Sequence, residues 1–238
     1  MSTLVCFALK EEAAPFHKIA ARHPGVITII VGIGRANAEK SVRNFLAGGA
    51  GVLASREPAA SGQARLAGTL APPELVLTCG FAGGLNPDLK LGDVVFELSD
   101  PQLPAANSQL RAKLLAAGAK PVKIICTDRI ATIVAEKIKL RAETGADAVE
   151  MESAAIQAVC AERGIPCATV RVISDTADED LPLDFNTLAK PDKSIDFGKL
   201  AWAIAKSPGK IGALMRLQKK TSFAAGELAA VLGEIIIP

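Results

Sequence analysis

Residues 149–178 read VEMESAAIQAVCAERGIPCATVRVISDTAD, and they place charged side chains inside otherwise apolar segments. Ionised groups in apolar surroundings are costly unless they are paired or used in chemistry. Glu150, Glu152, Arg171 and Asp175 are therefore the first candidates for an active site. The competing interpretation is a buried ion-pair network that has no catalytic role.

The same stretch indicates how the chain folds. Residues 146–150 and 167–173 are short apolar runs typical of buried strands, and the helix-like segment between them ends at Gly164 and Pro166. Alternating strands and helices predict an α/β fold, in which a largely parallel sheet carries helices on both faces and ligands bind at the strands' carboxyl ends. Further strands are expected at residues 3–8, 26–31, 75–79, 92–97 and 122–126.

Composition argues against several classes of function. The 238 residues are half apolar, which suits one large domain. Lys and Arg number 27 against 25 Asp and Glu, and aromatic residues make up 4%, so we expect no nucleic-acid partner. With only two histidines and no Gly-x-Ser-x-Gly motif, we expect no metal, no cofactor and no Ser-His-Asp triad.

Several features predict a cytoplasmic protein. Residues 1–10 lack the basic region of a signal peptide, and no run approaches the roughly 20 apolar residues of a membrane-spanning helix. The five cysteines are odd in number and show no Cys-x-x-Cys spacing, which is typical of buried, reduced thiols.

The last part of the chain, residues 195–238, is predicted to be a basic helical tail of the single domain 1–238. Lysines and arginines alternate there with large apolar residues such as Trp202 and Met215. Two interpretations stay open: helices that pack on the domain and leave a basic face in solvent, or a peripheral contact with an anionic membrane surface.

Two glycine-rich segments follow predicted strands. Gly32-Ile-Gly34 is either a tight turn or an anion contact, and residues 80–84 (GFAGG) would let the backbone approach a ligand closely. Glu11 and Glu12 begin a predicted helix after the first strand, where they could simply complement the helix dipole.

Together these groups suit one kind of reaction. Asp175, partly buried at a strand end, could act as an acid, and Glu152 could accept hydrogen bonds from two hydroxyl groups. Arg171 needs a carboxylate near it, and Glu12 is a candidate partner. An acid, a hydroxyl acceptor and a Glu/Arg pair that holds water are suited to cleaving a glycosidic bond through an oxocarbenium-like transition state.

The motifs VEMES (149–153), SDTAD (174–178) and GFAGGLNP (80–87) followed by LGDVV (91–95) resemble the purine nucleoside phosphorylase and nucleosidase superfamily. Over residues 3–180 the chain is similar to the methylthioadenosine/adenosylhomocysteine nucleosidases. It is more similar to the hopanoid-associated phosphorylase-like family, which removes adenine from adenosylhopane, because the segment SPGKIGALMRL (207–217) matches that family's C-terminus. The resemblance implies a single-domain α/β/α sandwich with a mixed, mostly parallel sheet, and a homodimer or larger assembly.

The resemblance also assigns roles. Asp175, which follows Ser174, would protonate purine N7. Met151 and Glu152, beside Glu150, would hold the ribose, and Glu12 with Arg171 would activate water. The backbone of Ile130 and Ala131 would read the purine edge, and the remaining site positions are Gly80, Phe81, Ala82 and Gly83 of the glycine loop.

Three departures from the family pattern bear on the substrates. Phe81 stands where the nucleosidases have a serine near the water, and Thr78 stands where bacterial phosphorylases have a phosphate-binding arginine. With Glu12 present, we expect hydrolysis rather than phosphorolysis, because water needs a base where phosphate needs cations. The short connection 98–106 predicts an open 5′ side suited to a lipid tail. Methylthioadenosine or adenosylhomocysteine hydrolysis, phosphorolysis, and a nucleoside-binding module without turnover remain as alternatives.

Overall fold

In the computed structural model, the described residues are 2–48, 72–98, 104–188, 190, 198–199, 202, 206 and 208–236. The helix and loop expected over residues 47–73 lie almost wholly outside this set. So do much of the connection 98–106 and of the tail before residue 208.

The described strands form one eight-stranded mixed sheet. Its main order is β2-β1-β3-β8-β4-β5, in which β4 runs antiparallel to β8, and the short β7 pairs antiparallel with the end of β3 and parallel with β6. The strands are β1 (Thr3–Phe7), β2 (Val26–Ile30), β3 (Leu75–Gly84), β4 (Val94–Glu97), β5 (Lys120–Pro121), β6 (Ile124–Cys126), β7 (Ala148–Glu150) and β8 (Cys167–Asp175).

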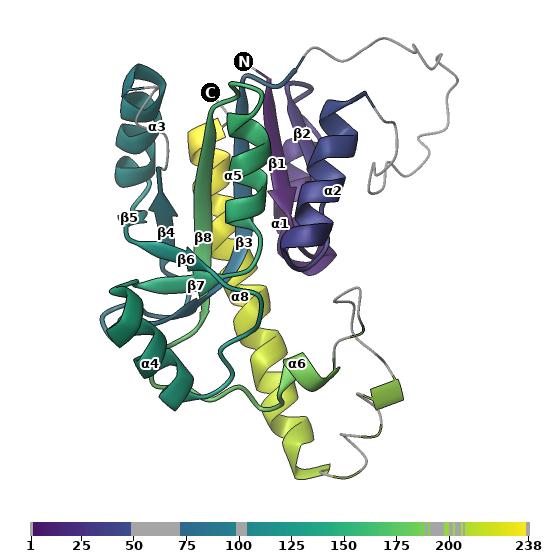
Figure 1. The fold of residues 1–238 in the computed structure, drawn as a ribbon, viewed down its shortest axis with the longest axis vertical. Coiled ribbons are helices and arrows are strands. Elements are labelled where there is room, and N and C mark those ends of the chain that lie inside the picture. Colours follow the sequence, from purple (N-terminus) through teal and green to yellow (C-terminus); the bar gives the residue numbers. More distant parts are fainter. Residues whose placement is uncertain are drawn as a thin grey trace.

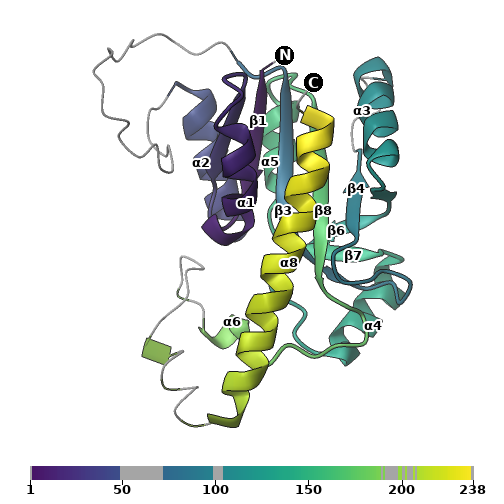
Figure 2. The same ribbon diagram turned by 180° about the vertical axis from the view of Figure 1, so that it is seen from behind.

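Helices cover both faces of this sheet. Figure 1 shows α2 and α5 on one face, and the view from behind in Figure 2 shows α1 and α8 on the other. The described helices are α1 (Lys10–Ala20), α2 (Arg35–Leu46), α3 (Pro104–Ala116), α4 (Val134–Thr144), α5 (Ser153–Ala161), α6 (Phe185–Leu188), a 3₁₀ turn η1 (Pro208–Lys210) and α8 (Ile211–Ile236). The predicted α/β/α arrangement with a mixed, mostly parallel sheet is confirmed.

Two apolar clusters hold these layers together. Along β1, β3 and β8, successive side chains point to opposite faces of the sheet. One cluster therefore forms between the sheet and the helices α1 and α8, and the other between the sheet and α2 and α5. The C-terminal half of α8 contributes buried residues such as Leu228 and Leu232 to the first cluster. In both views the N-terminal half of α8 extends past the strand ends beside α6, where it reaches the site.

The glycine segment differs from the prediction. A loop was expected after residue 79, but β3 continues to Gly84, pairing with β8 as far as Asp175 and with Ala148 and Val149 of β7. Glycines disfavour strands on local grounds, yet here they allow neighbouring groups to approach the strand closely. The prediction of a glycine loop was therefore wrong, and its residues belong to a rigid strand.

The helix α4 buries an unexpected face. Ile133, directly before the helix, is 46% exposed, and Ile138 is 62% exposed. Lys137 is instead completely buried. Lys137 contacts polar groups at the end of β8, as described below.

Candidate active site

A pocket opens at the carboxyl ends of the central strands, with a volume of about 500 Å³. It collects residues from α1, β3, β7 and β8, from the segment 127–131, and from α6 and α8. Arg171 and Gly80 lie behind its wall rather than in its lining. The other predicted site residues all line it, and they are Glu12, Phe81, Ala82, Gly83, Ile130, Ala131, Glu150, Met151, Glu152, Ser174 and Asp175.

Asp175 is presented to the pocket by an irregularity at the end of β8. The pairing with β3 shifts between Ala82 and Gly83, because Gly83 pairs with Asp175 while Ala82 pairs with Ile173, and Ser174 is left as the extra residue. Such a bulge re-aims side chains and is common beside active sites. The Ser174 hydroxyl donates to Asp175 Oδ1 at 2.8 Å, which helps to hold the carboxyl group in place.

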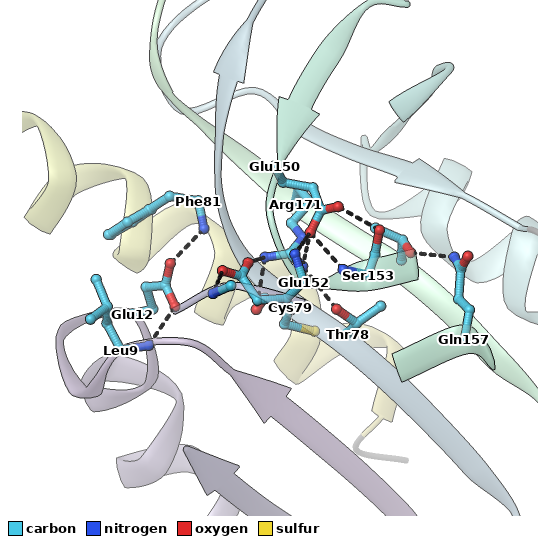
Figure 3. A network of polar contacts seen from close by, with 12 residues as sticks. Leu9, Glu12, Thr78, Cys79, Phe81, Glu150, Glu152, Ser153, Gln157 and Arg171 are labelled. Carbon is cyan, nitrogen blue, oxygen red and sulfur yellow. Dashed lines mark hydrogen bonds and ion pairs between the residues drawn. The ribbon is translucent and has the colours of Figure 1, made fainter. Parts of the chain in front are cut away.

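Arg171, in the middle of β8, is 1% exposed and pairs with two carboxylates. Its Nη2 lies 2.5 Å from Glu150 Oε2, and its Nη1 lies 3.5 Å from Glu152 Oε2. Nη2 also donates to the Thr78 hydroxyl at 2.8 Å (Figure 3). The predicted direct pairing of Arg171 with Glu12 is thus replaced by an ion-pair network with Glu150 and Glu152.

The pKa values of Glu150 and Glu152 shift in opposite directions. Glu150 accepts hydrogen bonds from the Ser153 hydroxyl and from two backbone N–H groups. Burial would raise the pKa of Glu150, but Arg171 and these hydrogen bonds hold it below its usual value. Burial dominates at Glu152, and the pKa of Glu152 is raised despite the attraction of Arg171. Glu150 therefore anchors the start of α5, while Glu152 stays at the pocket wall.

The turn Gly32-Ile-Gly34 contacts Glu152 directly. The backbone N–H of Gly34 donates to Glu152 Oε1 at 2.8 Å, so this N–H serves a carboxylate of the site. Gly34 has a φ of 85°, a conformation that favours glycine, and it begins α2. Glu152 is thereby fixed from two sides, by Gly34 and by Arg171.

Glu12 is buried in the first turn of α1 and lines the pocket. Figure 3 shows its carboxylate between the backbone N–H groups of Leu9 and Phe81, both at 2.9 Å. Burial raises the pKa of Glu12 to about 7, against the opposing effect of these hydrogen bonds and of Arg171. A carboxylate with this pKa is suited to act as a base near neutral pH.

Gly80 explains how Glu12 and Arg171 can lie close together without a direct hydrogen bond. A Cβ at position 80 would stand 2.8 Å from Glu12 Oε1 and 2.9 Å from Arg171 Nη1, which leaves no room for a side chain. The φ of Gly80 is +145°, which also favours glycine. Gly80 therefore contributes to the site because it has no side chain, which lets Glu12 and Arg171 lie next to its backbone.

Among the residues missed in the sequence are two that hold predicted site residues in place. Lys137 of α4 lies 2.6 Å from Asp175 Oδ2, but it sits in a charged helical segment where nothing in the pattern marks it as buried. The carboxamide of Asn186 both donates to the Ile130 carbonyl and accepts from the Ile130 N–H, each at 2.9 Å. Asn186 comes 56 residues later in the chain, so no local signal connects the two.

Asn186 supports the segment that brings Ile130 and Ala131 to the pocket lining, and its removal tests that role. Asn186→Ala deletes two hydrogen bonds to Ile130, each worth about 0.5–1.5 kcal/mol. Because the neighbouring Ala131 would then be held less firmly, we expect the KM for the nucleoside to rise about 10-fold while kcat changes little. Steady-state kinetics check this, with Thr187→Ala as the matched control. An unchanged KM in Asn186→Ala would contradict the role.

Part of the pocket lining is apolar. Leu181, Phe185 and Leu217 line it together with Leu9 and Phe81, and Leu217 comes from α8. The tail therefore contributes to the site rather than only covering the domain. Among the described residues, no group of three or more His, Cys, Asp or Glu could hold a metal ion, and no described helix is long and apolar enough to cross a membrane.

The fold is the one seen in solved nucleosidase structures, a mixed sheet with helices on both faces. It places an aspartate after the bulge of β8 and a Met-Glu pair directly after β7. Residues 98–206, just under half of the chain, match the family model described as Phosphorylase superfamily.

Two of the relatives by sequence are named as nucleosidases. A 5′-methylthioadenosine/S-adenosylhomocysteine nucleosidase of Shewanella halifaxensis is 33% identical over an alignment that covers 48% of this chain and 62% of the relative. An aminodeoxyfutalosine nucleosidase of Campylobacter jejuni is 28% identical over an alignment that covers 48% of this chain and 61% of the relative. The aligned part thus spans less than two thirds of these relatives' lengths.

Solved structures show the same fold. The Campylobacter jejuni 5′-methylthioadenosine/S-adenosylhomocysteine nucleosidase has a TM-score of 0.62 at 16% identity and covers 99% of this chain and 98% of its own. The futalosine hydrolase of Helicobacter pylori has a TM-score of 0.60 at 19% identity. The match covers 98% of this chain and 97% of the hydrolase chain. The resemblance found in the sequence motifs, to the phosphorylase and nucleosidase superfamily, is therefore confirmed.

Proposed function

We propose that the chain cleaves the N-glycosidic bond of a 5′-substituted adenosine and releases adenine. The observation that carries this proposal is the convergence of Asp175, Glu152 and Glu12 on one pocket with an apolar extension. They come from β8, the start of α5 and α1, so the fold brings together an acid, a hydroxyl acceptor and a base that are far apart in the sequence. The nucleosidase relatives support the same reaction class.

The proposed steps follow the charge that develops on each fragment. Asp175 gives a proton to purine N7 as the C–N bond breaks and its electron pair moves to the base. Glu152, beside Met151, accepts hydrogen bonds from the ribose hydroxyls and stabilises the oxocarbenium-like sugar. Ala131 meets the purine edge through its backbone N–H and C=O, for which the described residues provide no other partner.

Water is the proposed nucleophile. Glu12, with a pKa of about 7, can take a proton from water near neutral pH. A phosphate anion would need uncommitted cations. Arg171 is already matched by Glu150 and Glu152, and Thr78 is buried beneath it. These contacts favour hydrolysis over phosphorolysis.

The 5′ substituent is proposed to be a long apolar group, as in adenosylhopane. The apolar part of the pocket lining supports this, because Leu181, Phe185 and Leu217 offer contacts to hydrocarbon. On α8, Ile211 and Met215 are also exposed apolar residues, with exposed fractions of 46% and 57%.

The tail is also proposed to rest on an anionic membrane surface, where a lipid substrate would be found. Lys210, Arg216 and Lys219 lie among the exposed apolar residues of η1 and α8, and such basic amphipathic helices bind anionic lipid. We further propose a cytoplasmic homodimer or larger homo-oligomer. The exposed Ile133 and Ile138 of α4 offer an apolar surface for a second copy.

A series of 5′-alkyl adenosines tests the substrate proposal. Each additional buried methylene contributes about 0.8 kcal/mol, so kcat/KM is expected to rise about 4-fold per methylene until the groove is filled. Adenine release is measured with adenosine, methylthioadenosine and alkyl chains of increasing length. A preference for methylthioadenosine over every longer chain would contradict the lipid-like substrate while leaving the nucleosidase reaction in place.

A further inference from the structure

Lys137 is the buried cation of the site that the roles above do not use. Its side chain is completely buried, and its ammonium group donates to three oxygens. These are Asp175 Oδ2 at 2.6 Å, the Thr176 carbonyl at 2.6 Å and the Glu179 carbonyl at 2.9 Å. A protonated lysine has three N–H donors, and all three are satisfied here. The contacts therefore define a site for a charged ammonium group.

Packing alone does not explain this lysine. The helix α4 leaves Ile133 and Ile138 in solvent while it buries Lys137, which reverses the usual order of burial. Burying an ammonium group is costly unless it is paired. The partner is Asp175, the residue to which the proposed function gives the proton transfer.

We propose that Lys137 is a positioning residue for Asp175: it holds the carboxyl group in the pocket and stabilises the carboxylate that remains after Asp175 has given its proton to the purine. This inference rests on the proposed function. The proton passes from the Asp175 carboxyl group to purine N7, and the electron pair of the broken C–N bond goes to the base. Lys137 keeps its three protons throughout. Its positive charge favours the state reached after proton transfer, so the contact is stronger in that state than before it.

The two oxygens of Asp175 are held separately, which fixes the orientation of the group. Lys137 contacts Oδ2, and the Ser174 hydroxyl donates to Oδ1. Because Lys137 is tied to the carbonyls of Thr176 and Glu179, it also fixes the backbone that follows Asp175. If the Asp175 carboxyl group were displaced, it would no longer lie within hydrogen-bond reach of purine N7, even if the substrate still bound.

Other charged groups face this pair and bear on its pH dependence. Asp178 is exposed, and the charge of Lys137 contributes to lowering the pKa of Asp178. The Glu179 carboxylate forms an ion pair with Lys220 of α8 at 2.5 Å. On α4 itself, Glu136 is engaged by the Thr132 N–H and by Arg129. Because each of these carboxylates contacts another partner, the ion pair of Lys137 is with Asp175.

Lys137→Met tests the proposal, with Lys139→Met as the matched control. Lys139 lies two residues further along the same helix, and its side chain is 74% exposed. We expect Lys137→Met to lower kcat about 100-fold with a KM close to that of the wild type. The pH profile of kcat should also shift, because the substitution removes a positive charge 2.6 Å from the Asp175 carboxyl group. Lys137→Arg should restore part of the rate, and Lys139→Met should behave as the wild type.

A double-variant cycle separates this role from a merely structural one. In an Asp175→Asn background, Lys137→Met should lower kcat less than about 3-fold further, because the group through which it acts is gone. Should Lys137→Met fail to fold, Lys137→Gln replaces it, since it keeps donors for the carbonyls of Thr176 and Glu179. An unshifted pH profile, or the same loss in both backgrounds, would overturn the proposal.

A binding measurement distinguishes a failure of this inference from a failure of the proposed function. If the wild type releases no adenine from any nucleoside, the proposed function fails by itself. Calorimetry of adenine binding in two buffers still reports any proton uptake on binding. This uptake should differ between Lys137→Met and the wild type, because the substitution removes the cation beside Asp175. Identical proton uptake in the two proteins would reject the role of Lys137.

Discussion

Asp175→Asn is expected to lower kcat for adenine release by about 10²- to 10⁴-fold, the range typical of a lost general acid. The substitution keeps the size of the side chain and its acceptor for the Ser174 hydroxyl, but it replaces the Oδ2 atom that accepts from Lys137. The leaving base would then depart without a proton on N7. Because the sugar contacts through Glu152 are unaffected, KM should change only a few-fold. Steady-state kinetics on a 5′-alkyl adenosine measure both constants.

The matched control is Asp178→Asn. Asp178 belongs to the same SDTAD motif, but it is exposed and accepts from the Thr176 hydroxyl rather than facing the pocket. Its rate should stay within about 3-fold of the wild type, as expected for a surface substitution. Asp175→Asn with undiminished kcat would remove the acid role from the account, whatever the control shows.

Glu12→Gln is expected to lower the rate of hydrolysis by about 10²- to 10⁴-fold, because the amide cannot take a proton from water. A base must be ionised to act, and burial raises the pKa of Glu12 to about 7. Wild-type activity should therefore rise with pH through about 7 and fall about 10-fold per unit below it. Glu12→Gln should lose this acidic limb. A pH profile of kcat/KM for both proteins provides the measurement.

Glu11→Gln is the control for this change, since Glu11 is the exposed neighbour in the same helical turn. It should keep both the rate and the acidic limb. If Glu12→Gln retained full activity in phosphate buffer and none without phosphate, the base role would be wrong. The nucleophile would then be phosphate.

The sequence predicts the fold well because strands and helices alternate with clear boundaries. The strands expected at residues 3–8, 26–31 and 167–173 were found with small shifts at their ends. Costly charges in apolar runs also predicted that Glu152 and Asp175 would be drawn to one site, and both line the pocket.

Long-range pairings could not be predicted in the same way. The partner of Arg171 depends on which carboxylates the turn after β7 places beside β8, and this choice is made by the register of the sheet. Lys137 and Asn186 are recruited by polar groups far away in the chain. Local pattern assigns lysine to the surface and asparagine to turns, so neither residue carried a signal.

Product analysis tests the central claim most directly. The wild type is incubated with a 5′-alkyl adenosine in ¹⁸O-labelled water, with and without phosphate, and the products are identified by mass spectrometry. The account predicts adenine together with a 5-alkyl ribose that carries one ¹⁸O atom, at the same rate in both buffers. An unlabelled ribose 1-phosphate formed only with phosphate, or no adenine at all, would contradict it.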